Sequence, residues 1–253
     1  MGKMNNLDYV KEQYHKSDNL NTRISLHDKY STNKMGLPNW YFSIYQINNG
    51  MKILELGCGT GSMWLEHKDV MAKCKQIVLS DLSAGMLKTA QKNIGDMNNV
   101  IYEVIDIQNI PYDDNYFDIV IANYMLYHVP DLHKAISEVS RVLRSDGYFY
   151  AGTAGENGIM EAIAKILDMD FVYENTFTLE NGMKKIEPYF RTVEIKKYID
   201  SLEVTNVDNL LDYLYSGITF RLPRDEVREK LMSHMKNGVL ILPKEPGMFV
   251  AVK

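Results

Sequence analysis

The chain has 253 residues, which is enough for one α/β domain with additions and does not demand two. Its net charge of −5 argues against a general affinity for nucleic acid, because such binding depends on basic side chains that neutralise phosphates. The two cysteines, Cys58 and Cys74, form neither a disulfide framework nor a CxxC pair. Neither a membrane-spanning apolar run nor a signal peptide is evident in the sequence, so we expect a cytoplasmic protein.

From Lys52 onward, short apolar runs alternate with amphipathic stretches, a pattern typical of βαβ units and a parallel sheet. The apolar runs predict strands at 52–56, 76–80, 100–104, 117–122 and 147–152. The intervening stretches predict helices at 62–74, 83–94 and 131–143. Beyond the fifth strand we expect helices near 157–170 and 178–190, a strand at 192–199, helices at 206–216 and 224–237, and a strand at 247–252.

The domain organisation follows from this pattern. Residues 1–45 are less regular and predict an N-terminal helical cap. Residues 46–253 predict a doubly wound, mostly parallel α/β domain with a helical insertion at about 203–240.

Residues 53–61 read Ile-Leu-Glu-Leu-Gly-Cys-Gly-Thr-Gly, an apolar strand that leads directly into three alternating glycines. Gly57, Gly59 and Gly61 leave one face of a sharp turn without Cβ atoms, so a ligand can approach the backbone there. Glu55 precedes them at the carboxyl end of the strand, the edge where open α/β sheets bind ligands. A dinucleotide fingerprint needs Gly or Ala at its sixth position, and this chain has neither from either starting glycine.

Polar side chains also follow the next three predicted strands. Asp81 ends the second strand, where a carboxylate can accept hydrogen bonds from adjacent ribose hydroxyls. Asp106 follows the third, where it can accept from an adenine amino group, and Asn123 follows the fourth. Any one of them alone is more often a turn former or helix cap. Their joint placement at the ends of consecutive strands predicts a site for an adenosyl group.

These motifs resemble those of the class I S-adenosylmethionine (SAM)-dependent methyltransferases. The resemblance covers about residues 50–153 and is carried by 54–61, Asp81-Leu82-Ser83, Asp106-Ile107, 116–120 and 143–147. The phrase Tyr-Met-Leu-Tyr-His-Val-Pro-Asp at 124–131 is similar to the subgroup that modifies small molecules, akin to the ubiquinone and menaquinone methyltransferases. The resemblance implies a Rossmann-like, seven-stranded sheet with an antiparallel last strand, and SAM lying across the glycine loop.

The resemblance also implies roles for individual residues. Glu55 would lie near the amino group of SAM, Asp81 on its ribose and Asp106 at its adenine. Leu82 and Met86 would pack on the adenine plane, although apolar residues there are equally ordinary core. The expected cofactor-binding residues are Tyr30, Glu55, Gly57, Cys58, Gly59, Gly61, Asp81, Leu82, Met86, Asp106, Ile107 and Asn123.

Related enzymes often close an N-terminal segment over the cofactor, with a tyrosine or arginine that reaches its carboxylate. Tyr30 is the first candidate for this contact here, followed by Arg23 and Trp40. The alternative is a pair of solvated helices that only covers the sheet. The other expected wall of the acceptor pocket is the helical insertion, with its aromatic residues Tyr213, Tyr215 and Phe220.

Methyl transfer from a sulfonium is an in-line displacement, so the protein mainly aligns donor and acceptor. His128 is the candidate general base, because it follows the fourth strand and histidine titrates near neutral pH. We favour the simpler interpretation that His128 orders its own loop, since a positioned acceptor can react without a base. Tyr124 and Tyr127 either hold a sulfonium or a flat acceptor, or serve as packing surface. Cys58 is expected to be a small filler of the tight loop rather than a reactive thiol.

The leading function is therefore transfer of a methyl group from SAM to O, N or C of a small-molecule acceptor, with S-adenosylhomocysteine as the second product. An RNA or protein methyltransferase would need a basic groove, which the acidic composition disfavours. A protein that binds SAM or a nucleoside without turnover would show a broken motif, and a nicotinamide oxidoreductase ranks last. Scattered histidines predict no metal site. The acceptor and the oligomeric state stay open, a homodimer included.

Overall fold

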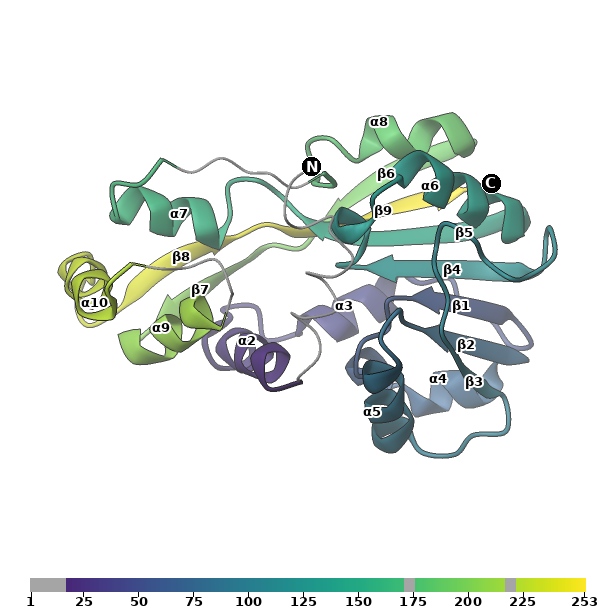
Figure 1. Cartoon of the computed structure of the whole chain (residues 1–253), viewed down its shortest axis with the longest axis horizontal. Helices are drawn as coiled ribbons and strands as arrows, with labels where there is room; N and C mark the ends of the chain where they lie inside the picture. The colour runs from purple at the N-terminus through teal and green to yellow at the C-terminus, as the bar shows by residue number, and fades with distance from the viewer. Residues whose placement is uncertain (1–16, 171–175, 217–221) are drawn as a thin grey trace.

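The computed structural model describes residues 17–170, 176–216 and 222–253. Seven strands form one sheet in the order β3-β2-β1-β4-β5-β9-β6 (Figure 1). Their bounds are β1 (Lys52–Leu56), β2 (Gln76–Ser80), β3 (Val100–Glu103), β4 (Phe117–Asn123), β5 (Leu143–Ala154), β6 (Thr192–Lys197) and β9 (Pro246–Val252). The first five strands run parallel, and β9 is antiparallel to both β5 and β6. The expected mostly parallel sheet with an antiparallel last strand is confirmed.

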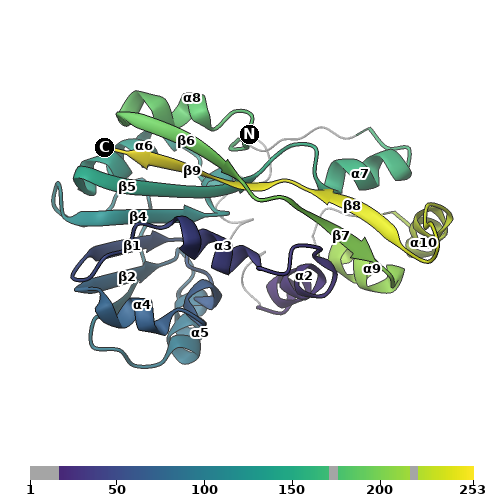
Figure 2. The ribbon, with the colours of Figure 1, turned by 180° about the vertical axis from the view of Figure 1, so that it is seen from behind.

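Helices cover both faces of this sheet because its strands are apolar on both sides. Along β1, Ile53 and Leu54 point to opposite faces and belong to two separate hydrophobic cores. The hydrophobic core that contains Leu54 includes residues of α6 (Leu132–Val142) and α8 (Met183–Ile186). The core of Ile53 packs against the helices seen on the other face in Figures 1 and 2, α3 (Leu37–Ile44), α4 (Lys68–Lys73) and α5 (Ala84–Ile94).

A smaller helical unit extends from one end of the sheet (Figure 2). Its centre is a two-stranded antiparallel ribbon, β7 (Asp200–Val204) paired with β8 (Leu240–Lys244). β7 follows β6 almost directly and β8 leads into β9, so the ribbon prolongs two strands of the sheet. Four helices pack around it and share a hydrophobic core: α2 (Ser17–Tyr30), α7 (Ile159–Ile166), α9 (Val207–Tyr215) and α10 (Arg224–Ser233).

Several elements differ from the sequence-based expectations. The expected helical insertion is flanked by the two ribbon strands, which the sequence did not predict. These strands are too short to show a clear alternation of apolar and polar residues, since only Leu202 and Val204 of β7 are buried. The helix expected at 62–74 forms as two short pieces, η2 (Ser62–Trp64) and α4. Helix α2, from the expected N-terminal cap, packs with the helices of the insertion rather than on the sheet.

Candidate functional site

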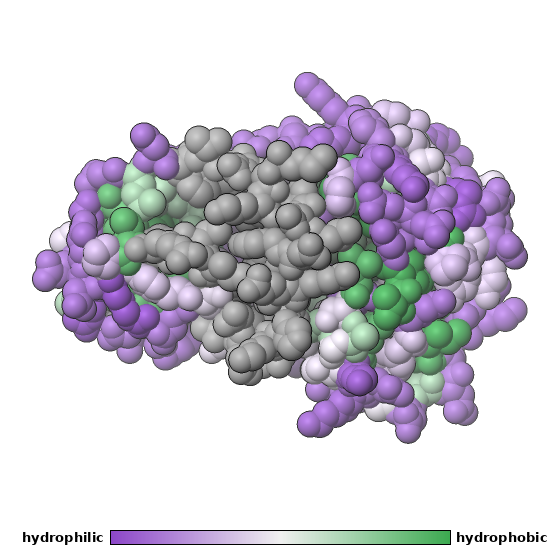
Figure 3. Space-filling view, viewed as in Figure 1, coloured by the Kyte–Doolittle hydropathy of each residue, from purple (hydrophilic) through white to green (hydrophobic). Residues whose placement is uncertain are grey.

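A cavity of about 1040 Å³ lies between the carboxyl ends of the parallel strands and the helical unit. The sheet contributes the glycine loop after β1 and the segments after β2, β3 and β4, while α2, α7 and α9 contribute from the other side. On the face shown in Figure 3, hydrophobic residues gather on either side of the middle of the molecule, and the periphery is hydrophilic. The cavity therefore occupies the edge at which open α/β sheets bind ligands.

The glycine loop has a backbone that only glycine adopts without strain. Gly57, Gly59 and Gly61 all have positive φ angles, of 72°, 55° and 71°. A Cβ added to Gly57 would lie 2.8 Å from the Cβ of Met125, and one added to Gly61 would lie 2.8 Å from Cδ1 of Ile94. Gly57 and Gly59 line the cavity, whereas Gly61 packs on α5. The glycines thus let the loop turn tightly and let neighbouring elements approach it.

Asp81 braces this loop from the end of β2. Its Oδ2 accepts a hydrogen bond from the backbone N–H of Gly59 (3.0 Å), and its Oδ1 accepts one from that of Ser83 (2.8 Å). Burial raises the pKa of Asp81, and these two hydrogen bonds oppose the rise. A carboxylate offers about four acceptor positions, so both oxygens can accept again from a ligand. Asp81 therefore combines a structural role with a free binding capacity on the cavity wall.

The segment after β3 supplies the third carboxylate. Asp106 Oδ1 accepts hydrogen bonds from the backbone N–H (2.9 Å) and the side chain (3.1 Å) of Gln108. Ile107, Leu82 and Met86 line the same cavity. This combination of one carboxylate and an apolar slot suits a flat heterocycle with an exocyclic amino group.

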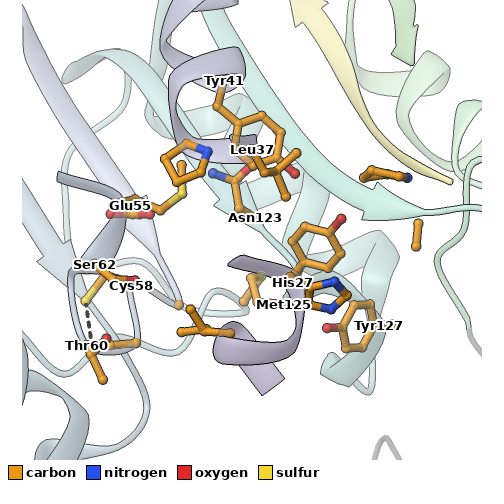
Figure 4. A pocket seen from close by; sticks show the side chains of 18 of the residues that line it. His27, Leu37, Tyr41, Glu55, Cys58, Thr60, Ser62, Asn123, Met125 and Tyr127 are labelled. Carbon is orange, nitrogen blue, oxygen red and sulfur yellow. Dashed lines mark hydrogen bonds between the residues drawn. The ribbon is translucent and has the colours of Figure 1, made fainter. Parts of the chain in front are cut away.

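Glu55 is almost completely buried at the end of β1, where its Oε2 accepts a hydrogen bond from Trp64 Nε1 (2.6 Å). Burial raises the pKa of Glu55 to about 7, against the effect of the Trp64 bond and with a further increase from the charge of Asp81. Figure 4 shows Glu55 on the wall of the cavity above Cys58 and Ser62. Glu55 can therefore gain or lose its charge near neutral pH, according to what binds beside it.

This pKa predicts a pH dependence of stability. The unfolded glutamate loses its proton near pH 4.5, whereas folded Glu55 keeps it up to about pH 7. The contribution of Glu55 is thus fully present at low pH and is lost as the pH rises to about 7, which lowers the free energy of unfolding by up to about 3 kcal/mol. Urea unfolding between pH 5 and 8 should show this decline in the wild type. It should be absent in E55Q, whose neutral amide still accepts from Trp64; an identical decline in both would contradict the assignment.

Asn123, at the end of β4, has an incomplete set of hydrogen bonds. Its Nδ2 donates to the hydroxyl of Tyr45 (2.7 Å), but its buried Oδ1 has no partner among the described residues. Tyr41 is also buried and lies beside Asn123 on the cavity wall (Figure 4). Because an unpaired buried carbonyl is costly, Oδ1 marks a position where a ligand can donate a hydrogen bond.

The three candidates for catalysis, Tyr124, Tyr127 and His128, all line the cavity. Tyr124 has a φ of 54°, a strained backbone for a non-glycine residue and one that is common at functional sites. The His128 ring packs edge-on against Tyr127, with ring centroids 4.5 Å apart. The backbone N–H of His128 donates to the carbonyl of Met125 (2.9 Å), which orders the short helix η3 (Leu126–His128).

Cys58 lines the cavity through the tight loop, and its side chain is buried. Burial raises the pKa of its thiol well above the usual value, and the charges of Glu55 and Asp81 raise it further. The thiol therefore stays protonated at neutral pH and is a poor nucleophile.

Tyr30, which we expected to contact the cofactor, does not line the cavity. Tyr30 is buried in the core of the helical unit and its hydroxyl donates to Asn209 Oδ1 (3.1 Å). Trp40 packs on Tyr198, with ring centroids 5.2 Å apart, and is not a lining residue. Both side chains are drawn away from the cavity because each completes a hydrophobic contact elsewhere. The side chain of Arg23 lies outside the described residues.

Among the aromatic residues of the insertion, Tyr213 lines the cavity as expected. Tyr215 does not; the guanidinium of Arg224 lies over its ring, 5.5 Å from the ring centroid. Phe220 lies outside the described residues.

The segment 31–36, which we call the strap, crosses the cavity between α2 and α3, and Ser31, Asn33 and Lys34 line it. Asp200 at the start of β7 holds the strap: its carboxylate accepts from Ser31 Oγ (2.6 Å) and from the backbone N–H of Asn33 (3.0 Å). Burial raises the pKa of Asp200, but hydrogen bonds from Lys244, Ser31 and Asn33 outweigh it and hold the pKa at about 2.

Within residues 17–170, 176–216 and 222–253, no cluster of three His, Cys, Asp or Glu side chains could hold a metal ion. No helix in that same part of the chain is long and apolar enough to cross a membrane.

An α/β sheet of this order, with a glycine loop and carboxylates at the ends of its first strands, is the fold of the class I methyltransferases. Comparison with known proteins agrees. Residues 54–151 match the family model described as a methyltransferase domain. The ubiquinone/menaquinone biosynthesis C-methyltransferase UbiE of Haemophilus ducreyi is 31% identical over 104 residues, which are 40% of this chain and 40% of that protein. The match therefore spans about two fifths of the length of such curated relatives.

Solved structures extend the likeness of fold to the rest of the chain. The [4+2]-cyclase SpnF superposes with a TM-score of 0.63 at 17% identity and covers all of this chain and 97% of its own. A methyltransferase-like protein of Bacillus halodurans, BH2331, gives a TM-score of 0.57 at 20% identity, over 86% of this chain and 98% of its own. Residues 54–151 thus match the methyltransferase domain family, and the solved structures show the class I methyltransferase fold over most of the chain.

Proposed function

We propose that the protein binds SAM and transfers its methyl group to a small molecule. The observation that carries this proposal is the convergence of Glu55, Asp81 and Asp106 with the unpaired Oδ1 of Asn123 on one wall of the cavity, around the glycine loop. These groups are hydrogen-bond acceptors, and SAM presents donors to match: an ammonium group, two ribose hydroxyls and an adenine amino group.

Each side chain has a defined task in this proposal. Asp81 binds the ribose hydroxyls with the acceptor capacity left beside its two backbone bonds. Asp106 binds the adenine amino group, and Leu82 and Met86 sandwich the ring. Glu55 and Asn123 face the amino group of the methionine end. When bound, SAM supplies an activated methyl group, so the chain contributes mainly alignment, which supplies about 7–11 kcal/mol in favourable cases.

The size of the cavity supports a second ligand. Small-molecule pockets are commonly about 300–1,000 Å³, and this cavity, at about 1040 Å³, slightly exceeds that range. Tyr124, Tyr127 and Tyr213 also line the cavity, and the space beside them is the proposed place of the acceptor. The size of the cavity supports a small molecule over an RNA or a protein, and we place the reaction in the cytoplasm as part of the same proposal.

Titration calorimetry with S-adenosylhomocysteine and, separately, with NAD tests the cofactor assignment. We expect S-adenosylhomocysteine to bind with an affinity at least tenfold above that of NAD. The ammonium group of the homocysteine end can donate hydrogen bonds to Glu55 and Asn123. The phosphates of NAD, in contrast, would be repelled by the carboxylates of the cavity. Tight binding of NAD, with none of S-adenosylhomocysteine, would contradict the proposal.

The likeness to a cyclase shows that this fold also serves other reactions, so transfer needs its own test. The protein is incubated with methyl-labelled SAM and either the small-molecule or the macromolecular fraction of a cell extract. We expect label only in the small-molecule fraction, where mass spectrometry then identifies the product. Label in RNA or protein would favour the alternative acceptors, and binding without any transfer would favour a non-catalytic role.

A further inference from the structure

The end of the cavity under the helical unit has a lining of its own. Ile24 and His27 of α2, Ile159 and Met160 of α7, and Tyr213 of α9 surround it, and we call this part the acceptor chamber. In Figure 4, His27 lies beside Tyr127 and Met125, on the far side of the cavity from Glu55 and Cys58. Most of these side chains are apolar or aromatic, so an acceptor gains most of its binding free energy by burying an apolar body.

His27 is the polar exception in this chamber. Its ring packs edge-on against Tyr213, with ring centroids 5.8 Å apart and an interplanar angle of 86°. The buried Nδ1 has no hydrogen-bond partner among the described residues. Burial lowers the pKa of His27 to about 4; the charge of Lys244 lowers it further and that of Asp200 opposes this. At neutral pH the ring is therefore uncharged, with one donor and one acceptor nitrogen.

The charges around the cavity are mostly negative. Among the described residues the lining contains six carboxyl side chains and two lysines: Asp28, Glu55, Glu66, Asp81, Asp106, Glu245, Lys34 and Lys244. Only one of these two lysines has a carboxylate partner among the described residues. Lys244 is paired with Asp200, and Lys34 donates to the carbonyl of Ser31 (2.7 Å). Asp28 neighbours His27 on α2, and Glu245 follows Lys244, so among the described lining residues an anion would meet six carboxyl side chains and only one lysine, Lys34, that is not paired with a carboxylate.

We propose that His27 is a specificity-determining residue that hydrogen-bonds the methyl acceptor, and that the acceptor has an apolar or aromatic body and carries no carboxylate or phosphate. The inference rests on the proposed function, because it takes the carboxylate-rich end of the cavity to be filled by the cofactor. His27 positions the acceptor and leaves its proton in place. A neutral ring of low pKa suits that task better than proton removal.

Ligand-observed NMR on protein saturated with S-adenosylhomocysteine tests the inference. The probes are tyrosol and 4-hydroxyphenylacetate, which share a 4-hydroxyphenyl ring and differ mainly in the charge at the other end. We expect tyrosol to bind at least about tenfold more tightly than 4-hydroxyphenylacetate. H27F keeps the ring against Tyr213 but removes both nitrogens. It should weaken tyrosol about fivefold, the loss of one neutral hydrogen bond.

The control is H234F, which makes the same change at an exposed position immediately after α10 and outside the cavity lining. It should leave the affinity for tyrosol unchanged. Equal binding of the two probes, no binding of tyrosol, or equal effects of H27F and H234F would each overturn the inference. Binding of S-adenosylhomocysteine is measured first: if it binds while these results fail, only the inference is lost, and if it does not bind, the proposed function fails as well.

Discussion

Replacing Gly57 by alanine is expected to destabilise the protein by roughly 2–5 kcal/mol and to abolish measurable binding of S-adenosylhomocysteine. A left-handed backbone costs a residue with a Cβ about 1–2 kcal/mol. The new methyl group would also lie 2.8 Å from the Cβ of Met125, and overpacking of that kind costs about 1–3 kcal/mol. The loop can relieve the contact only by moving, which displaces the cavity wall. Urea unfolding and calorimetry measure the two effects.

Gly50 provides a matched control for this substitution. Its φ of 79° is close to that of Gly57, but a Cβ added there meets nothing within 4 Å. G50A should therefore cost only the backbone strain, about 1–2 kcal/mol, and leave the affinity for S-adenosylhomocysteine intact. If G57A and G50A destabilise the protein equally, the close approach of Met125 is not what requires glycine at position 57.

The second large effect is expected from D81N, which should weaken the binding of S-adenosylhomocysteine by about 1.5–3 kcal/mol, roughly 10- to 150-fold. The amide keeps the size of the side chain but lacks the charge that strengthens hydrogen bonds from ribose hydroxyls. Its NH₂ group must also face one of the two backbone N–H donors, of Gly59 or Ser83, that the carboxylate now satisfies. Binding is measured by calorimetry, and hydrogen exchange at the Gly59 amide reports whether the loop loosens.

D69N makes the same change in charge on the surface. Asp69 pairs with Lys73 on α4 at 3.6 Å, and both side chains are mostly exposed, so the pair contributes little. We expect its affinity for S-adenosylhomocysteine to match that of the wild type. If D81N also matches the wild type, Asp81 does not hold the ribose, and the proposed position of the cofactor is wrong.

The cofactor end of the molecule could be predicted from sequence because its signals are local. The central strands β1, β2 and β4 are mostly apolar and buried, as expected for a sheet covered on both faces. The residues that follow them therefore converge at one edge wherever the helices lie. Glu55, Asp81 and Asp106 do line a common cavity for this reason. Gly61 was placed in the correct loop, but its contact with Ile94 of α5 depends on packing that the motif does not encode.

The acceptor end could not be predicted in the same way, because its residues come from elements far apart in the chain. His27 reaches the cavity only because α2 packs beside α9, across about 180 residues of sequence. Tyr30, one turn further along the same helix, points into the core instead. A sequence shows that both residues are polar or aromatic, but the rotation of the helix decides which one faces the ligand. Short strands such as β7, with two buried side chains, have too few alternating apolar residues for the ribbon to be predicted from sequence.

That ribbon has a consequence for how the protein can diversify. β7 and β8 prolong strands β6 and β9 of the sheet. The helices α9 and α10 between them are therefore connected to the sheet through a hydrogen-bonded ribbon rather than through a flexible linker. Insertions or substitutions between residues 205 and 239 can reshape the wall that faces the acceptor while the glycine loop and its carboxylates keep their positions. Changes in that segment are thus expected to alter the proposed acceptor site and to leave the proposed cofactor site in place.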